Sequence, residues 1–181
     1  MRDSTDLYNM TNITYITGDA TKPIGLGRKI IAHVVNREGG WGKGFVLALS
    51  AVSPEPERVY RDWFRRRDSL PPDLQQDVPF VLGQVKLAQF IPDDVFVANM
   101  LAQREPMTPG VIPLNYSSLS FCLDKLAVLA ARGSCSVHMP RIGCGLAGGE
   151  WKYVQPLIMR SLCSNNIPVT VYDFPQGGPA K

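Results

Sequence analysis

Residues 137–151 read Val-His-Met-Pro-Arg-Ile-Gly-Cys-Gly-Leu-Ala-Gly-Gly-Glu-Trp, an apolar run followed by four glycines and then by the start of a helical pattern. Glycine has no Cβ, so the backbone can take positive φ and approach a ligand with its N–H groups outward. A helix that begins near Gly149 adds unpaired N–H groups and the positive end of its dipole. We therefore expect a phosphate-binding loop. The alternative is that the glycines only make a sharp turn between strand and helix.

This segment also contains a dinucleotide-binding pattern, because Gly143-Cys-Gly-Leu-Ala-Gly148 matches G-x-G-x-x-G and Asp173 closes the next apolar run. In that fingerprint the glycines follow the strand directly, whereas here residues 140–142 intervene. Few residues follow Asp173, too few for a second mononucleotide-binding half. We therefore expect the chemistry of diphosphate binding without a dehydrogenase.

The composition is that of an ordinary globular protein, with 181 residues of which 45% are hydrophobic and 19% charged. We expect one domain over residues 12–175, with flexible tails at 1–11 and 176–181. The net charge of +3 is too small to indicate a nucleic-acid partner. Neither a membrane-spanning run nor a signal peptide is present in the sequence. We expect a monomer that is cytoplasmic, or nuclear in a eukaryote.

The hydrophobic pattern predicts an alternation of strands and helices. Apolar or β-branched runs predict strands at 13–16, 29–35, 84–90, 95–101, 135–139 and 169–174. Helical spacing predicts helices from residue 45, over 57–67, over 116–132 and over 151–162. Strands separated by helices, with one hairpin in the middle, predict a mixed sheet covered by helices on both faces. Ligands of such sheets bind at the carboxyl ends of the strands.

Polar and glycine-rich segments collect at those ends. Asp19 follows the first strand, Asn36 and Gly39-Gly-Trp-Gly-Lys-Gly44 follow the second, and Tyr172 to Phe174 close the last. Two glycine loops exceed the needs of one phosphate and suit a diphosphate with a sugar at either end. Asp19 could accept a hydrogen bond from an amine such as that of adenine, or serve as a turn or N-cap carboxylate. Tyr172 or Phe174 could stack on a base or pack in the core.

Three other features favour structural interpretations. Lys43 does not belong to a Walker loop, because Arg37 occupies the position of the first glycine and Gly44 that of the hydroxyl residue. His33 and His138 lie within apolar runs without other ligands at metal-binding spacing, which favours core histidines and no metal site. The arginine-rich residues 58–67 predict a solvated helix face.

The motifs in their order resemble a macrodomain. They are Ile-Thr-Tyr-Ile-Thr-Gly-Asp19-Ala, Ala-His33-Val-Val-Asn36 with Gly-Gly-Trp-Gly-Lys-Gly, Met-Pro-Arg-Ile-Gly-Cys-Gly-Leu and Val-Thr-Val-Tyr-Asp-Phe, over about residues 13 to 175. The branch they are most similar to contains the terminal ADP-ribose protein glycohydrolase, the ADP-ribose 1''-phosphate phosphatase and the macrodomain of a chromatin-remodelling helicase. The resemblance implies a three-layer α/β/α sandwich with a mixed central sheet of about six strands, and ADP-ribose as ligand without a separate cofactor.

The resemblance also implies roles for individual residues. Asp19 would accept the adenine amine with Ala20 near the ring, Tyr172 would lie near adenine, and Asn36 would contact the distal ribose. The diphosphate would be wrapped by Gly42, Lys43, Gly44 and Phe45 and by Gly143, Cys144, Gly145 and Leu146, with Arg141 at the entrance to the second loop.

One departure concerns catalysis. The glycohydrolase of this branch uses an aspartate after Gly-Cys-Gly-Leu and a lysine from the strand near residue 100. Here Ala147 takes the aspartate position, and residues 99–104 contain no lysine. A hydrolase would then rely on Asn36 and the phosphate of the ligand to position a water, with ADP-ribose on protein carboxylates or ADP-ribose 1''-phosphate as substrate. The alternative is a module that binds ADP-ribose or ADP-ribosylated protein without turnover.

Overall fold

The computed structural model describes residues 12–69, 77–92, 94–104 and 110–175. The tails predicted to be flexible, 1–11 and 176–181, lie outside these residues. The strands are β1 (Ile13–Thr17), β2 (Lys29–Asn36), β3 (Val85–Ile91), β4 (Val95–Gln103), β5 (Ser136–Met139) and β6 (Val169–Asp173). The α-helices are α1 (Phe45–Val52), α2 (Glu55–Arg65), α3 (Tyr116–Gly133) and α4 (Trp151–Ser161).

The strands form one six-stranded sheet in the order β1-β6-β5-β2-β4-β3. Every neighbouring pair is parallel except β3 and β4, which are antiparallel and connected as the predicted hairpin. The prediction of a mixed six-stranded sheet is confirmed. Because β1, β6, β5, β2 and β4 run in one direction, their carboxyl ends meet at a single edge of the sheet.

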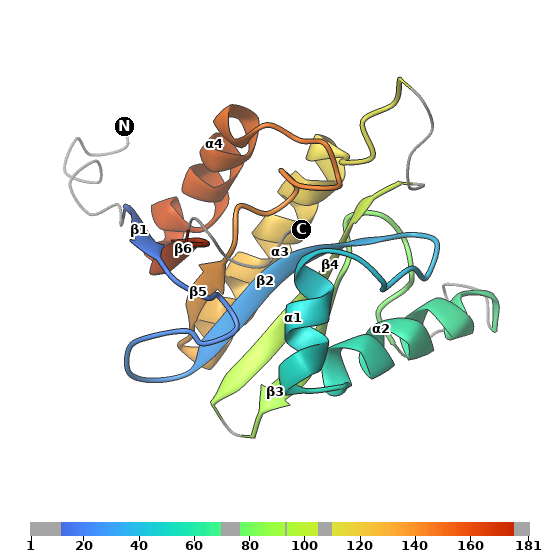
Figure 1. The fold of residues 1–181 in the computed structure, drawn as a ribbon, viewed down its shortest axis with the longest axis horizontal. Helices are drawn as coiled ribbons and strands as arrows, with labels where there is room; N and C mark the ends of the chain where they lie inside the picture. Colours follow the sequence, from blue (N-terminus) through green and yellow to red (C-terminus); the bar gives the residue numbers. More distant parts are fainter. Residues whose placement is uncertain (1–11, 70–76, 93, 105–109, 176–181) are drawn as a thin grey trace, which may run out of the picture.

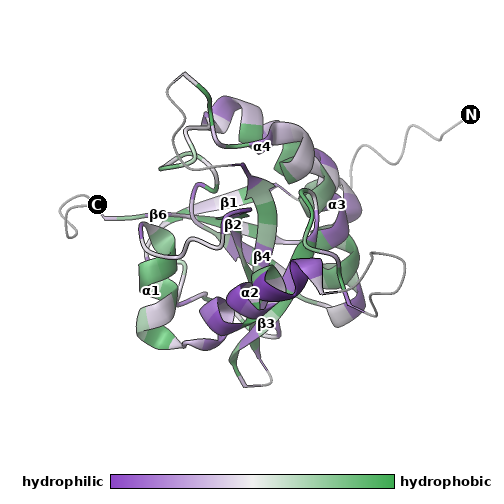
Figure 2. Cartoon of the chain, turned by 90° about the vertical axis from the view of Figure 1, so that its right-hand side faces the viewer, coloured by the Kyte–Doolittle hydropathy of each residue, from purple (hydrophilic) through white to green (hydrophobic). Residues whose placement is uncertain are grey.

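Helices cover both faces of the sheet (Figure 1). Side chains alternate along β2, so that Ile30 and Ala32 pack in the core under α3 and α4, and Ile31 and Val35 pack in the core under α1 and α2. Figure 2 shows α2 as the most hydrophilic helix, whereas α1 is hydrophobic along its length. The predicted α/β/α arrangement is confirmed, and the arginines of α2 face solvent as expected. No helix in the described part of the chain has the length and apolar character needed to cross a membrane.

One helix start differs from the predicted range. The helix α2 begins at Glu55 instead of residue 57, because Pro56 lies in the first turn, where a missing N–H costs the helix nothing. The last helix begins at Trp151, as the predicted range 151–162 has it, and not at Gly149, where the glycine segment alone suggested a start. The N–H of Gly149 instead donates to the carbonyl of Gly143 over 2.8 Å, which closes the glycine segment on itself.

Candidate functional site

Both glycine loops lie at the carboxyl edge of the sheet and touch one another. The first glycine loop, residues 39–44, follows β2, and the second, residues 143–149, follows β5, the parallel neighbour of β2. The Leu146 side chain lies over Gly44, with its Cδ1 3.4 Å from the position that a Cβ there would take. The two loops predicted to act together are therefore adjacent.

Both loops present backbone N–H groups that have no partner. In the part of the chain that the structure describes, none of the N–H groups of residues 42–46 donates a hydrogen bond. Within the same limits, those of Gly143 and of residues 145–147 are also unpaired. The first set includes the start of α1, where the helix dipole adds positive potential. Two adjacent groups of unpaired donors thus lie at one edge of the sheet, and an anion with several oxygens could accept from both.

The four glycines of the second loop have different roles, and only two of them use the positive φ that glycine allows. Gly143 has φ 72° and Gly148 φ 70°, whereas Gly145 and Gly149 lie outside that region. A Cβ at Gly149 would lie 2.6 Å from the Gly143 carbonyl oxygen, so glycine is needed there for close approach. A Cβ at Gly145 would meet no atom within 4 Å. Gly145 therefore borders open space beside the unpaired donors.

The Asn36 side chain is bonded into the first glycine loop. Its Oδ1 accepts hydrogen bonds from the N–H of Glu38 at 2.9 Å and of Gly40 at 3.1 Å, and from the Tyr60 hydroxyl at 3.0 Å. Its Nδ2 donates to the Gly40 carbonyl at 2.9 Å. The second N–H of this amide makes no hydrogen bond within the described residues. Asn36 can therefore act on a ligand only as a donor.

The helix α2 supports this loop from behind, which the sequence analysis did not foresee. The Arg61 Nη1 donates to the Gly39 carbonyl at 3.0 Å, and the Phe64 ring lies directly under Gly39. The helix α1 adds a further contact, because its Ser50 hydroxyl accepts a hydrogen bond from Nε1 of the loop residue Trp41 at 2.8 Å. Tyr60 gave no signal in the sequence, because it lies between arginines and its partner Asn36 is 24 residues away.

Asp19 makes a turn and also keeps a free oxygen. Its Oδ1 accepts hydrogen bonds from both the N–H and the hydroxyl of Thr21, at 2.9 and 2.8 Å. No described residue donates to Oδ2. The neighbouring Ala20 is buried. The turn role that the sequence left open is thus present, and one carboxylate oxygen remains available to a ligand.

Tyr172 is buried in the described structure, with 4% of its surface exposed. Its hydroxyl bonds to the N–H of Ile24 at 3.0 Å and to Nδ1 of His138 at 2.8 Å, and burial raises the pKa of the phenol. The ring edge lies 3.5 Å from the position of a Cβ on Gly18, one residue before Asp19. Tyr172 therefore packs in the core, which is one of the two predicted roles. It lies on the same side of the candidate site as Asp19.

Arg141 is held in an ion pair at the entrance to the second loop. Its guanidinium donates two hydrogen bonds to the Asp173 carboxylate, at 2.6 and 2.9 Å, which holds the pKa of that carboxyl below its usual range. It also lies 5.3 Å from the Tyr15 ring and 5.1 Å from the Trp151 ring. Asp173, first noticed as a fingerprint carboxylate, thus fixes Arg141.

The two histidines are core residues, as predicted. His33 and His138 are 3% and 2% exposed, and burial lowers the pKa of each to about 4. The His33 Nε2 lies 2.5 Å from Oδ1 of Asn99, whose Nδ2 donates to the Pro56 carbonyl. Among the described residues, no group of three histidine, cysteine or acidic side chains is placed to hold a metal ion.

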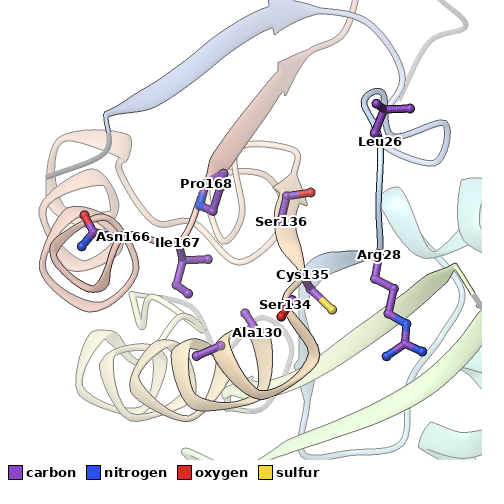
Figure 3. Close-up of a pocket in the computed structure, with 10 residues that line it drawn as sticks. Leu26, Arg28, Ala130, Ser134, Cys135, Ser136, Asn166, Ile167 and Pro168 are labelled. Carbon is purple, nitrogen blue, oxygen red and sulfur yellow. The ribbon is translucent and has the colours of Figure 1, made fainter. Parts of the chain in front are cut away.

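A cavity of about 340 Å³ lies at the opposite edge of the sheet (Figure 3). It is lined by the segment that enters β5, including Ser134 and Cys135, together with Arg28 and Asn166. None of the residues predicted to bind the ligand lines this cavity. The unpaired donors and polar side chains, not this cavity, therefore mark the candidate site.

The structure is an α/β/α protein with two glycine loops at one edge of its sheet, and the comparisons specify its family. No protein-family model matches the sequence. A solved macrodomain protein from Streptomyces coelicolor is 46% identical, with a TM-score of 0.75, and the match covers 90% of this chain and 99% of that one. The chain belongs to the macrodomain family, which confirms the resemblance carried by its motifs.

More distant matches agree with this assignment. The mouse chromodomain-helicase-DNA-binding protein 1-like is 31% identical over 176 residues, and the match covers 92% of this chain but only 18% of that protein. The ADP-ribose 1''-phosphate phosphatase of Candida albicans is 24% identical over 77% of this chain and 87% of its own length. The structure of Thermosipho africanus DarTG in complex with ADP-ribose shares the fold, at 21% identity and a TM-score of 0.64, over 94% of this chain and 43% of that one.

Proposed function

We propose that the protein binds ADP-ribose at the carboxyl edge of the sheet and hydrolyses ADP-ribosyl linkages there. The observation that carries the proposal is the two adjacent sets of N–H groups that have no partner among the described residues, those of residues 42–46 on the first glycine loop and those of Gly143 and residues 145–147 on the second. A diphosphate placed between them would accept from both, and each hydrogen bond to a charged oxygen contributes about 1.5–3 kcal/mol. Two relatives support this ligand: the ADP-ribose 1''-phosphate phosphatase of Candida albicans and Thermosipho africanus DarTG, whose structure is a complex with ADP-ribose.

The two ends of the ligand follow from the polar groups that flank the loops. The free Oδ2 of Asp19 would accept the exocyclic amine of adenine, with Ala20 and Tyr172 bordering the base. At the other end, the remaining Nδ2 hydrogen of Asn36 would point toward the distal ribose. Because Oδ1 of Asn36 is already occupied, this residue would orient a water by donating to it. A ligand phosphate oxygen would have to accept the proton of that water.

The hydrolytic step would break the bond between C1'' of the distal ribose and its substituent. A water oxygen attacks C1'', the substituent leaves with the bonding electrons, and the water proton passes to the phosphate. A carboxylate leaving group needs no general acid at neutral pH, because the pKa of a carboxylic acid is about 4. Linkages to protein carboxylates and to the 1''-phosphate therefore suit a site without an acidic catalytic side chain.

The competing proposal is a binding module without turnover, and two observations favour it. Ala147 is buried and has no functional group, and its carbonyl accepts from the N–H of Leu114 at 2.9 Å. Asn99 is fully buried and bonded to His33 and Pro56, so it has a structural role on β4. Ala147 therefore does not supply the aspartate, and Asn99 does not supply the lysine, that the glycohydrolase of the resembled branch uses.

Two measurements on the wild-type protein test the proposal. Calorimetry should detect ADP-ribose binding, weaker binding of ADP, and the weakest binding of ribose 5-phosphate, because the last two lack part of the recognised groups. Release of ADP-ribose from carboxylate-linked protein, or of phosphate from ADP-ribose 1''-phosphate, should then show turnover. Binding without release would support the non-catalytic module, and no binding of ADP-ribose would refute both versions.

A further inference from the structure

The side-chain amide of Asn36 is held in one orientation by several hydrogen bonds. A carboxamide oxygen has two lone pairs, and Oδ1 of Asn36 already faces three donors, from Glu38, Gly40 and Tyr60. Rotating the amide by half a turn would place its NH₂ group against two backbone N–H groups. The orientation of the remaining Nδ2 hydrogen is therefore fixed by the loop and by Tyr60.

Tyr60 is fully buried, with 0% of its surface exposed. Its ring is tilted against two other rings, with centroids 5.5 Å from that of Trp41 and 6.2 Å from that of Phe80. Its hydroxyl lies 2.6 Å from the backbone carbonyl oxygen of Asn36 and 3.0 Å from Oδ1 of the same residue. Burial raises the pKa of the phenol well above its usual value, so the group remains a hydrogen-bond donor across the physiological range. The single hydroxyl proton is shared between these two acceptors, so Tyr60 contacts both the main chain and the side chain of Asn36, with the shorter contact to the main chain.

We infer that Tyr60 is a positioning residue that aims the free Nδ2 hydrogen of Asn36 at the distal ribose and its attacking water. This inference rests on the proposed hydrolase function. Tyr60 is buried behind the loop on α2 and acts only through Asn36. The proposed diphosphate donors, the N–H groups of residues 42–46, Gly143 and residues 145–147, make no hydrogen bond with the Tyr60 hydroxyl, so binding and orientation depend on different groups.

The test replaces Tyr60 by phenylalanine, which removes the hydroxyl and keeps the ring. Displacing a catalytic group by about 1 Å can cost about a hundredfold in rate, so kcat for ADP-ribose release should fall about ten- to a hundredfold. The affinity for ADP-ribose should remain within about twofold, because the backbone donors stay in place. Tyr60→Phe is a cleaner probe than Asn36→Ala, which would also release Glu38 and Gly40 from the loop.

Trp63→Phe is the matched control on the same helix. Trp63 is 4% exposed, and its Nε1 donates to the Val78 carbonyl at 2.7 Å, away from Asn36. This variant also loses one buried hydrogen bond from an aromatic residue, and it should destabilise the protein at least as much as Tyr60→Phe. Its kcat should equal that of the wild type. Equal losses of kcat in both variants would assign the effect to stability and overturn the inference.

A measurement independent of turnover separates this inference from the hydrolase proposal. The side-chain NH₂ signals of Asn36, followed by ¹⁵N-edited NMR, should shift or broaden in Tyr60→Phe and stay unchanged in Trp63→Phe. Unchanged signals in Tyr60→Phe would overturn the inference whether or not the wild type releases ADP-ribose. Shifted signals together with a wild type that releases nothing would refute the hydrolase proposal and retain Tyr60 only as the residue that orients Asn36.

Discussion

The two glycine loops present the same kind of donor but are held in place differently. The first is fixed from outside by side chains of α2, through Tyr60, Arg61 and Phe64. The second is fixed by its own backbone, through the bond from Gly149 to Gly143, and by the packing of Leu114. The conformation of a loop that side chains hold in place depends on the identity of those side chains. A loop fixed by backbone contact tolerates only glycine at the contact points.

The largest effect is expected from Gly143→Val. Gly143 has φ 72°, and a Cβ there would lie 2.7 Å from Cδ2 of Leu114, so the substitution adds both backbone strain and overpacking. These costs together should lower the free energy of unfolding by about 2–5 kcal/mol. Urea unfolding followed by circular dichroism measures the loss. Wild-type stability in this variant would show that the second loop is not held by its backbone.

Gly145→Val should behave in the opposite way and provides the control within the same loop. Its φ is not positive and its Cβ would meet no protein atom, so stability should stay within about 0.5 kcal/mol of the wild type. The side chain would occupy the space beside the unpaired donors and should weaken ADP-ribose binding about a hundredfold, or about 2.7 kcal/mol. Calorimetry on the folded variant checks this. Wild-type affinity would place the ligand elsewhere.

The support behind the first loop should weaken in mild acid. His33 contacts Trp41 edge-on at 5.3 Å and is kept neutral by burial, with its pKa lowered from 6.5 to about 4. Because the unfolded chain binds this proton more readily, stability is full above pH 6.5, falls toward pH 4 and levels off below it. The loss from His33 is on the order of 3 kcal/mol.

Urea unfolding at pH 7, 5.5 and 4 measures this loss, and His138, whose pKa is also lowered to about 4, contributes in the same direction. His33→Gln should reduce the slope of stability against pH and leave the contribution of His138. An identical slope in this variant would show that the first loop does not depend on neutral His33.

The smallest effect is expected from Arg141→Gln at the entrance to the second loop. The Asp173 carboxyl has a lowered pKa, so this pair stabilises the protein above the unfolded pKa near 4, and the contribution is lost as the pH falls through the folded value. Both side chains are about 40% exposed, at 41% and 42%, so at neutral pH the variant should lose less than about 1 kcal/mol. A larger loss in urea unfolding would mean that the second loop also depends on side chains.

Much of the fold, and the position of the two glycine loops at one edge of the sheet, followed from the sequence alone. The apolar runs and helical spacings predicted the strands and helices, and the glycines after β2 and β5 predicted two loops at one edge. His33 and His138 were correctly assigned to the core. These features are local, because strand and helix periods and glycine content are properties of short segments.

The tertiary structure decided which groups hold the loops and which remain available. Tyr60 meets Asn36 only because α2 packs against the end of β2, and Asp173 meets Arg141 only because β6 lies beside β5. Gly143 and Gly145 look equivalent in the sequence, yet one is packed against Leu114 and the other borders open space. Such differences come from contacts between residues far apart in the chain, and single-sequence patterns carry no record of those contacts.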